Sequence, residues 1–241
     1  MNKYKTLIFD LDDTLTNNME SIRYAFEKVL EKLHCKFSDE QFFRWAKFDA
    51  DYWHAWESGR MKLPESVKTR EDRIRYLRSN RFIQFFEIEG IALSFENAVE
   101  LNEIYCEMMG VNIVEMENAG KLLTELYKEY EIVIATNGPK IAAINKVERA
   151  HLMPYVSFVL CSEEVGFSKP MPEFYNRLFE QMENKDKSTM LMIGDTLATD
   201  VLGGMKNGLD TCWLNWNKLP IPDEYHPTYV IHKLMELKDI L

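Results

Sequence analysis

Five short apolar runs mark the chain, at 4–9, 131–135, 156–160, 189–193 and 210–214. Runs of about five residues, several of them with β-branched side chains, are typical of strands buried on both faces, as in a parallel sheet. Between the later runs, apolar positions recur with helical spacing over 116–129, 140–150, 171–183 and 198–207. This alternation predicts an α/β fold built on a doubly wound parallel sheet.

A long helical stretch separates the first strand from the second. Apolar positions recur every three or four residues, with few breakers, over 19–33, 38–57, 65–87 and 94–109. We therefore expect a core domain of residues 1–16 and 96–241, interrupted after its first strand by an all-helical domain of residues 17–95.

Two stretches of the helical insertion each allow two interpretations. The large aromatic residues of the first fall on one helical stripe and either pack inside the insertion or stack on a flat group of a substrate: Phe42, Trp45, Tyr52 and Trp56. The second stretch, 69–81, carries five arginines, which form either a solvated face or a surface that recognises anions.

The charge of the chain limits its partners. Lys and Arg number 29 against 39 Asp and Glu, for a net charge of −10, so a nucleic acid or an anionic membrane is not the expected main partner. No apolar run approaches the ~18 residues of a membrane span, and aspartates follow the start too soon for a signal peptide. The four cysteines are scattered and are expected to be reduced thiols of a cytoplasmic protein.

Two aspartates follow the first strand in the sequence FDLDDT. In an extended chain, residues i and i+2 point the same way, so Asp10 and Asp12 can share one small space. Two close carboxylates repel each other unless a cation lies between them or one is protonated. The pair indicates a divalent metal site, a nucleophile with an acid/base partner, or both; turn and cap formation is the structural alternative.

Further polar residues follow other predicted strands. Asp195 ends the run MLMIGD, and Asp200 falls in the first turn of the next helix. Thr136 and Asn137 end the run IVIATNG, and Lys169 lies in the sequence SKP. Because ligands of open α/β sheets bind at the carboxyl ends of the strands, these residues and the first aspartates are expected to converge there. The carboxylates are a hard-oxygen donor set suited to Mg²⁺.

The order and spacing of these four elements resemble the motifs of the haloacid dehalogenase superfamily. Further stretches are similar to its noncanonical pyrimidine 5′-nucleotidases: WHAWESGRM (53–61), SEEVGFSKP (162–170), GDTLATDVLGG (194–204) and GLDTCWLN (208–215). The resemblance implies a Rossmann-like core with a helical cap inserted after the first strand. Halide-releasing members lack the second acid, so Asp12 favours phosphate chemistry.

The resemblance also implies the catalytic roles. Asp10 is the expected nucleophile, which becomes an aspartyl-phosphate. Asp12 is the expected general acid and then general base. Thr136 and Asn137 are expected to hold phosphoryl oxygens, and Lys169 to neutralise charge on them and on the nucleophile.

The same resemblance implies the metal ligands. The expected ligands of Mg²⁺ are Asp10, Asp195 and the backbone carbonyl of Asp12. Asp200 is expected to contact these ligands and not the metal itself. Thr14 is expected to steady the turn after the first strand.

We therefore expect a Mg²⁺-dependent phosphomonoesterase acting on a small nucleoside monophosphate, with a pyrimidine base favoured. The alternatives are a sugar-phosphate phosphatase or phosphomutase of the same superfamily, and a non-catalytic binding protein on the same scaffold. Arg70 in the insertion is a candidate contact to the base or sugar, or a surface residue. The expected partner is a small phosphorylated metabolite, and the expected state is a monomer or weak homodimer.

Overall fold

Six parallel strands, in the order β3-β2-β1-β4-β5-β6, form the sheet of the computed structural model, which describes residues 3–57 and 59–241. The strands are β1 (Thr6–Phe9), β2 (Glu131–Thr136), β3 (Phe158–Cys161), β4 (Met190–Gly194), β5 (Asp210–Leu214) and β6 (Tyr229–Ile231). The strand order runs outward in both directions from β1, as in a doubly wound sheet, and this confirms the predicted fold class. The short β6 was not expected.

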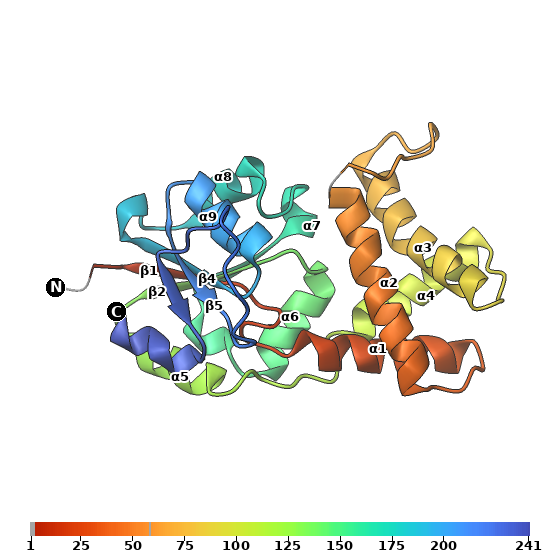
Figure 1. The fold of residues 1–241 in the computed structure, drawn as a ribbon, viewed down its shortest axis with the longest axis horizontal. Coiled ribbons are helices and arrows are strands. Elements are labelled where there is room, and N and C mark those ends of the chain that lie inside the picture. Colours follow the sequence, from red (N-terminus) through yellow and green to blue (C-terminus); the bar gives the residue numbers. More distant parts are fainter. Residues whose placement is uncertain (1–2, 58) are drawn as a thin grey trace. The chain divides into compact units, whose positions relative to one another are not determined.

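Helices cover both faces of the sheet (Figure 1). One face packs against α5 (Ala119–Leu126), α6 (Lys140–Arg149) and the 3₁₀ helix Leu234–Asp239. The other face packs against α8 (Pro172–Gln181). Along β1, Leu7 and Phe9 belong to the first of these cores and Ile8 to the second, as the alternation of strand side chains requires. The short helices α7 (Ser162–Val165) and α9 (Leu202–Lys206) complete this part.

The chain divides into a core unit, Met1–Glu20 with Gly110–Leu241, and a helical unit, Ser21–Met109. The insertion was expected at 17–95. The observed helical unit ends at Met109, which is one helix later than expected. That helix, α4 (Phe95–Met108), packs on α3 (Arg70–Ile88) and therefore belongs to the helical unit. Ser58, within the matched stretch 53–61, lies outside the described residues.

The four cysteines form no disulfide among the described residues, and three of them are buried: Cys106, Cys161 and Cys212. Among the described residues, no helix combines the length and the apolar character needed to cross a membrane.

Aromatic side chains form the core of the helical unit, which contains α2 (Asp39–Glu57) and most of α1 (Asn18–Lys32). The ring of Trp45 stacks on Phe26 and Phe82, with centroid separations of 5.1 and 4.8 Å, and its Nε1 donates to the hydroxyl of Tyr105. Phe42 and Tyr52 are buried as well. For these residues the packing interpretation of the aromatic stripe is therefore the one observed.

A buried ion pair lies within these rings. The Arg81 side chain is 5% exposed, and its Nη1 lies 2.6 Å from Oδ1 of Asp49. Its guanidinium carbon also lies 4.9 Å from the ring centroid of Tyr105 and 5.0 Å from that of Phe82. A buried guanidinium is tolerated when a carboxylate and hydrogen bonds compensate it, so this arginine of the 69–81 stretch does not belong to a solvated face.

We expect Asp49→Ala to destabilise the protein by about 3–5 kcal/mol, because it leaves the buried charge of Arg81 uncompensated. The matched control is Asp51→Ala on the same helix, which removes an exposed carboxylate paired with Lys47. Its free energy of unfolding should stay close to that of the wild type. Urea unfolding followed by tryptophan fluorescence measures both, and equal losses in the two variants would contradict this account.

Candidate active site

Two adjacent strands at the centre of the sheet each deliver an aspartate. Phe9 of β1 pairs with Ile193 of β4, so the chain exits both strands at the same level of the sheet. The backbone N–H of Asp10 donates to the carbonyl of Ile193 at 2.8 Å, and the Asp195 carbonyl accepts from the Trp213 indole at 2.7 Å. The backbone of each aspartate is thereby fixed at the carboxyl edge, where ligands of such sheets bind.

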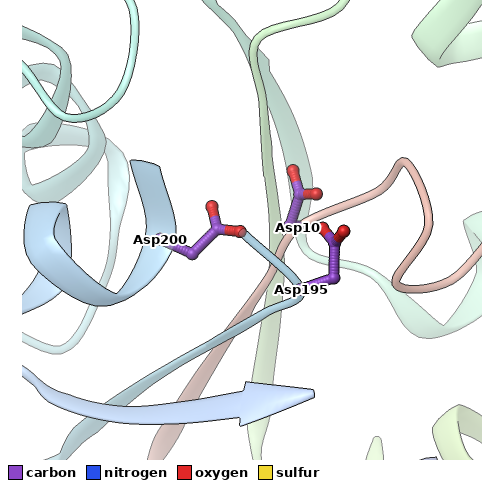
Figure 2. Close-up of side chains that lie close together, drawn as sticks. All are labelled: Asp10, Asp195 and Asp200. Carbon is purple, nitrogen blue, oxygen red and sulfur yellow. The ribbon is translucent and has the colours of Figure 1, made fainter. Parts of the chain in front are cut away.

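A third carboxylate comes from the π-helical turn Leu197–Val201. One carboxylate oxygen from each of Asp10, Asp195 and Asp200 lies within 4.8 Å of the other two, and Figure 2 shows the three side chains gathered together. Gly194 permits this approach, because a Cβ at that position would overlap the Asp200 carboxylate. The turn itself is held from α8, since the Tyr175 hydroxyl donates to the carbonyl of Thr199 at 3.1 Å.

Lys169 joins two of these carboxylates. Its side chain is 2% exposed, and its Nζ lies 2.6 Å from Oδ1 of Asp10 and 2.7 Å from Oδ1 of Asp200. Burial alone would lower the pKa of this ammonium, but the two carboxylates more than reverse that effect and raise it. Lys169 therefore remains a fixed positive charge at the base of the site.

The ammonium of Lys169 does not offset all the negative charge of the carboxylates in the site. Burial raises the pKa of Asp10 well above its ordinary range; Lys169 opposes the rise, and Asp200, Asp195 and Asp12 add to it. The pKa of Asp195 is raised to about 7, mainly by burial and then by Asp200. Buried carboxylates this close to one another need a further cation in order to be ionised together at neutral pH.

The donor set fits Mg²⁺. Among the described residues, Oδ2 of Asp10 and Oδ2 of Asp195 accept no hydrogen bond, so each is available to a cation. Both oxygens of Asp200 are already engaged, Oδ1 by Lys169 and Oδ2 by the N–H of Thr196 at 3.1 Å. Asp10 and Asp195 therefore suit direct ligation by hard oxygens, and Asp200 suits the support of Lys169.

Thr136 and Asp12 both lie close to Gly138. The buried Thr136 hydroxyl accepts from the Gly138 N–H at 3.0 Å. A Cβ at Gly138 would lie 3.2 Å from Oδ2 of Asp12 and 3.3 Å from the Thr136 hydroxyl. The glycine thus leaves room for the hydroxyl and the second carboxylate to approach the same space.

The hydrogen bonds of two predicted site residues, Asn137 and Thr14, differ from expectation. The Asn137 side chain is engaged at both ends by the backbone of Lys169: its amide donates to the carbonyl at 3.0 Å and its oxygen accepts from the N–H at 2.8 Å. It therefore fixes the backbone of the lysine, and its contact with a phosphoryl oxygen stays a prediction. The buried Thr14 hydroxyl makes no hydrogen bond with the described residues.

The turn after β1 is held by other groups than Thr14. The N–H groups of Leu15 and Thr16 both donate to the carbonyl of Leu11 at 2.9 Å, and the N–H of Asp13 donates to the Thr16 carbonyl. Arg70 is half-buried at the start of α3 in the helical unit, so it is not among the residues that the core unit brings together. Its contact with a substrate stays a prediction.

Lys146 is a residue of the site that was not expected from the sequence. This lysine of α6 is 1% exposed, and its Nζ forms an ion pair with Oδ1 of Asp12. One signal was present in the sequence: the residue falls on the apolar side of its helix, beside Ala142, Ala143 and Val147. A lysine on a buried face needs a counter-charge, and the aspartates of the first motif were candidates for it.

The comparison with family models matches residues 4–208 to the haloacid dehalogenase-like hydrolases. The chain belongs to this family. The matched range includes all the site residues described above, from Asp10 to Asp200.

Three bacterial relatives illustrate the similarity. The HAD-hydrolase YfnB of Bacillus subtilis is 31% identical, over 100% of this chain and 97% of that protein. The pyrimidine 5′-nucleotidase YjjG of Escherichia coli is 36% identical over 59% of this chain and 63% of its own. The pyrimidine 5′-nucleotidase PynA of Streptococcus pneumoniae is 29% identical over 99% and 95%.

The crystal structure of YfnB shares the fold. It superposes with a TM-score of 0.88 at 29% identity and covers 100% of this chain and 99% of its own. That crystal form is bound to magnesium and reveals interdomain movement in YfnB.

We expect Asp195→Asn to stabilise the metal-free protein at pH 7–8 and to abolish stabilisation by Mg²⁺. Because the pKa of Asp195 is raised to about 7 in the folded state, the folded carboxyl keeps a proton that the unfolded chain releases near its ordinary value of 3.8. Its contribution to stability is therefore lost as the pH rises from about 4 to 7. The amide removes that loss and also removes a ligand.

Thermal unfolding with and without Mg²⁺ measures this effect, and the melting temperature should differ by several degrees. Asp223→Asn, at an exposed position, is the control and should respond to Mg²⁺ as the wild type does. If Mg²⁺ raised the melting temperature of Asp195→Asn as much as that of the wild type, Asp195 would not be a ligand of the metal.

Proposed function

We propose that the protein is a Mg²⁺-dependent phosphomonoesterase that hydrolyses pyrimidine nucleoside monophosphates through an aspartyl-phosphate. One observation carries the proposal: Asp10 has one oxygen held by Lys169 and the other unengaged among the described residues, beside the carboxylate of Asp195. An oriented carboxylate next to a cation site is what attack on a phosphate ester requires.

In the first step, the Asp10 carboxylate attacks the phosphorus of the bound ester through one of its oxygens. A bond forms between this oxygen and phosphorus, and the bond from phosphorus to the ester oxygen breaks. Asp12, in its protonated form, gives its proton to the departing oxygen, so the nucleoside leaves as a neutral alcohol.

In the second step, Asp12 has become a carboxylate and takes a proton from a water molecule. The water oxygen attacks phosphorus, the bond to Asp10 breaks, and inorganic phosphate is released with the Asp10 carboxylate restored. Both steps use the same pair of acids in reversed roles, which explains why two carboxylates are needed at positions i and i+2.

The remaining residues reduce the repulsion between a carboxylate and a phosphate dianion. Mg²⁺, when held by Asp10, Asp195 and the carbonyl of Asp12, supplies positive charge against the phosphoryl oxygens. Lys169 adds a fixed ammonium, Asn137 holds the backbone of that lysine, and the Thr136 hydroxyl offers a donor to a phosphoryl oxygen.

The proposal that the substrate is a nucleotide is supported by the relatives of the chain. YjjG and PynA are pyrimidine 5′-nucleotidases, and PynA aligns with nearly the whole of this chain, helical unit included. The presence of Asp12 favours an ester whose leaving oxygen needs a proton over a halide, which leaves without one. Arg70 of the helical unit remains our candidate for contact with the base or sugar.

The purified protein should release phosphate from UMP, dUMP and dTMP in the presence of Mg²⁺, and EDTA should abolish the release. Purine nucleotides and a panel of sugar phosphates, assayed alongside, test the preference. Efficient hydrolysis of a sugar phosphate with no release from the three pyrimidine nucleotides would overturn the nucleotidase assignment. Transfer of the phosphoryl group to a second hydroxyl would identify a phosphomutase instead.

Asp10→Asn should abolish turnover, because the amide keeps the shape of the side chain and loses the nucleophile. Asp12→Asn should lower kcat by about 10²–10⁴-fold, the range typical of a general acid/base. Asp210→Asn is a control at a carboxylate of the same sheet, paired with Lys3 at the start of β5, and it should retain activity. Turnover by Asp10→Asn at the wild-type rate would contradict the mechanism.

A further inference from the structure

The core unit contains a second buried ammonium, which none of the proposed steps uses. Lys146 is 1% exposed, although it lies on a helix whose other buried residues are alanine and valine. Its Nζ contacts two oxygens, Oδ1 of Asp12 and, at 2.9 Å, Oδ1 of Asn18. Burying an ammonium costs free energy unless it is paired with acceptors. The partners of Lys146 therefore indicate the role of this residue.

The helix directs this side chain toward the site. Helix α6 begins at Lys140, just after β2 ends at Thr136, so its N-terminal end lies at the carboxyl edge of the sheet. Side chains on a helix tilt toward its N-terminus, and a long one covers the turn before it. At the turn before Lys146 stand Ala142 and Ala143, which are small enough to leave a path for the lysine stem.

The partners of Lys146 belong to one short loop. Asp12 precedes the turn that follows β1, and Asn18 is the first residue of α1. The N–H of Asn18 donates to Oδ1 of Asp13 at 2.9 Å, which ties the start of the helix to the same turn. The ammonium therefore bridges the two ends of the 12–18 loop.

This bridge leaves the two oxygens of Asp12 in different environments. Oδ1 accepts from the ammonium, whereas Oδ2 accepts no hydrogen bond from the described residues. Oδ2 faces the space above Gly138 that the Thr136 hydroxyl also approaches, as the 3.2 and 3.3 Å separations from a Cβ at Gly138 show. A general acid/base oriented by a third group through one of its atoms is a recurring arrangement in active sites.

We propose that Lys146 is the positioning residue of the acid/base, holding Asp12 through Oδ1 so that Oδ2 carries the transferred proton. The inference rests on the proposed phosphatase function. It assigns the two buried lysines to separate tasks: Lys169 holds the nucleophile, and Lys146 holds the acid/base. Lys146 touches no reacting atom and acts through Asp12.

The variant Lys146→Met tests this role, because it keeps the length and apolar stem of the side chain and removes the ammonium. Arg149→Met removes a positive charge from the exposed face of the same helix and is the matched control. The substrates are phenyl phosphate, whose leaving oxygen needs a proton, and p-nitrophenyl phosphate, whose leaving oxygen needs little assistance. The measured quantity is kcat/KM, which reports the first phosphoryl transfer and does not depend on hydrolysis of the intermediate.

For Lys146→Met we expect kcat/KM to fall about 10²-fold with phenyl phosphate and less than about tenfold with p-nitrophenyl phosphate. In the Asp12→Asn background, the same substitution should change neither value, because the group through which it acts is already lost. Arg149→Met should keep the wild-type values. General damage to the site would instead lower kcat/KM equally for the two esters, and it would add to the effect of Asp12→Asn.

The outcomes separate this inference from the proposed function. A wild-type protein that hydrolyses neither ester overturns both. An active wild type, combined with equal losses on the two esters or an additive loss in the Asp12→Asn background, overturns the role of Lys146 and leaves the phosphatase assignment standing. Circular dichroism checks the fold of each variant; if Lys146→Met does not fold, Lys146→Leu, which also removes the ammonium, undergoes the same comparisons with the same expected losses and decides the question.

Discussion

The buried ammonium of Lys169 holds the carboxylates of Asp10 and Asp200 together, and the geometry of the site depends on these two ion pairs. The carboxylates come from separate segments and would otherwise repel one another in a region with little water. The lysine is itself fixed by Asn137, through both its N–H and its carbonyl. Negative charge at the edge of the sheet is thus organised around a buried ammonium whose pKa is raised by the carboxylates beside it.

Most of the core fold could be predicted, because each buried strand of a parallel sheet is a short apolar run that ends where the chain reaches the edge. The meeting of Asp10 and Asp195 follows from the same rule, since each directly follows such a run. The strand β6 was missed because it has three residues and its central Val230 is exposed, so it lacks a continuous apolar pattern. The domain boundary near 95 was displaced because apolar spacing predicts a helix at 94–109 but not the unit on which it packs.

Contacts made by side chains across elements could not be predicted in this way. Asn137 stands at a strand end, as expected, but whether its amide faces a ligand or the Lys169 backbone depends on the path of a loop 32 residues away. Lys146 lies 134 residues from Asp12, and local spacing gives no sign of their pairing. The helix pattern does predict that this lysine is buried. A buried charged side chain requires a partner of opposite charge, so such a residue indicates an ion pair even where the partner is distant in the sequence.

The proposed mechanism requires that the Asp10 carboxylate accepts the phosphoryl group. The direct measurement is to quench the enzyme in acid during turnover of a phosphate ester with Mg²⁺, digest it, and locate the phosphoryl group by mass spectrometry. The account predicts one phosphoryl group on the peptide that contains Asp10 and on no other peptide. A phosphoryl group on a different residue, with Asp10 unmodified while turnover proceeds, would contradict it.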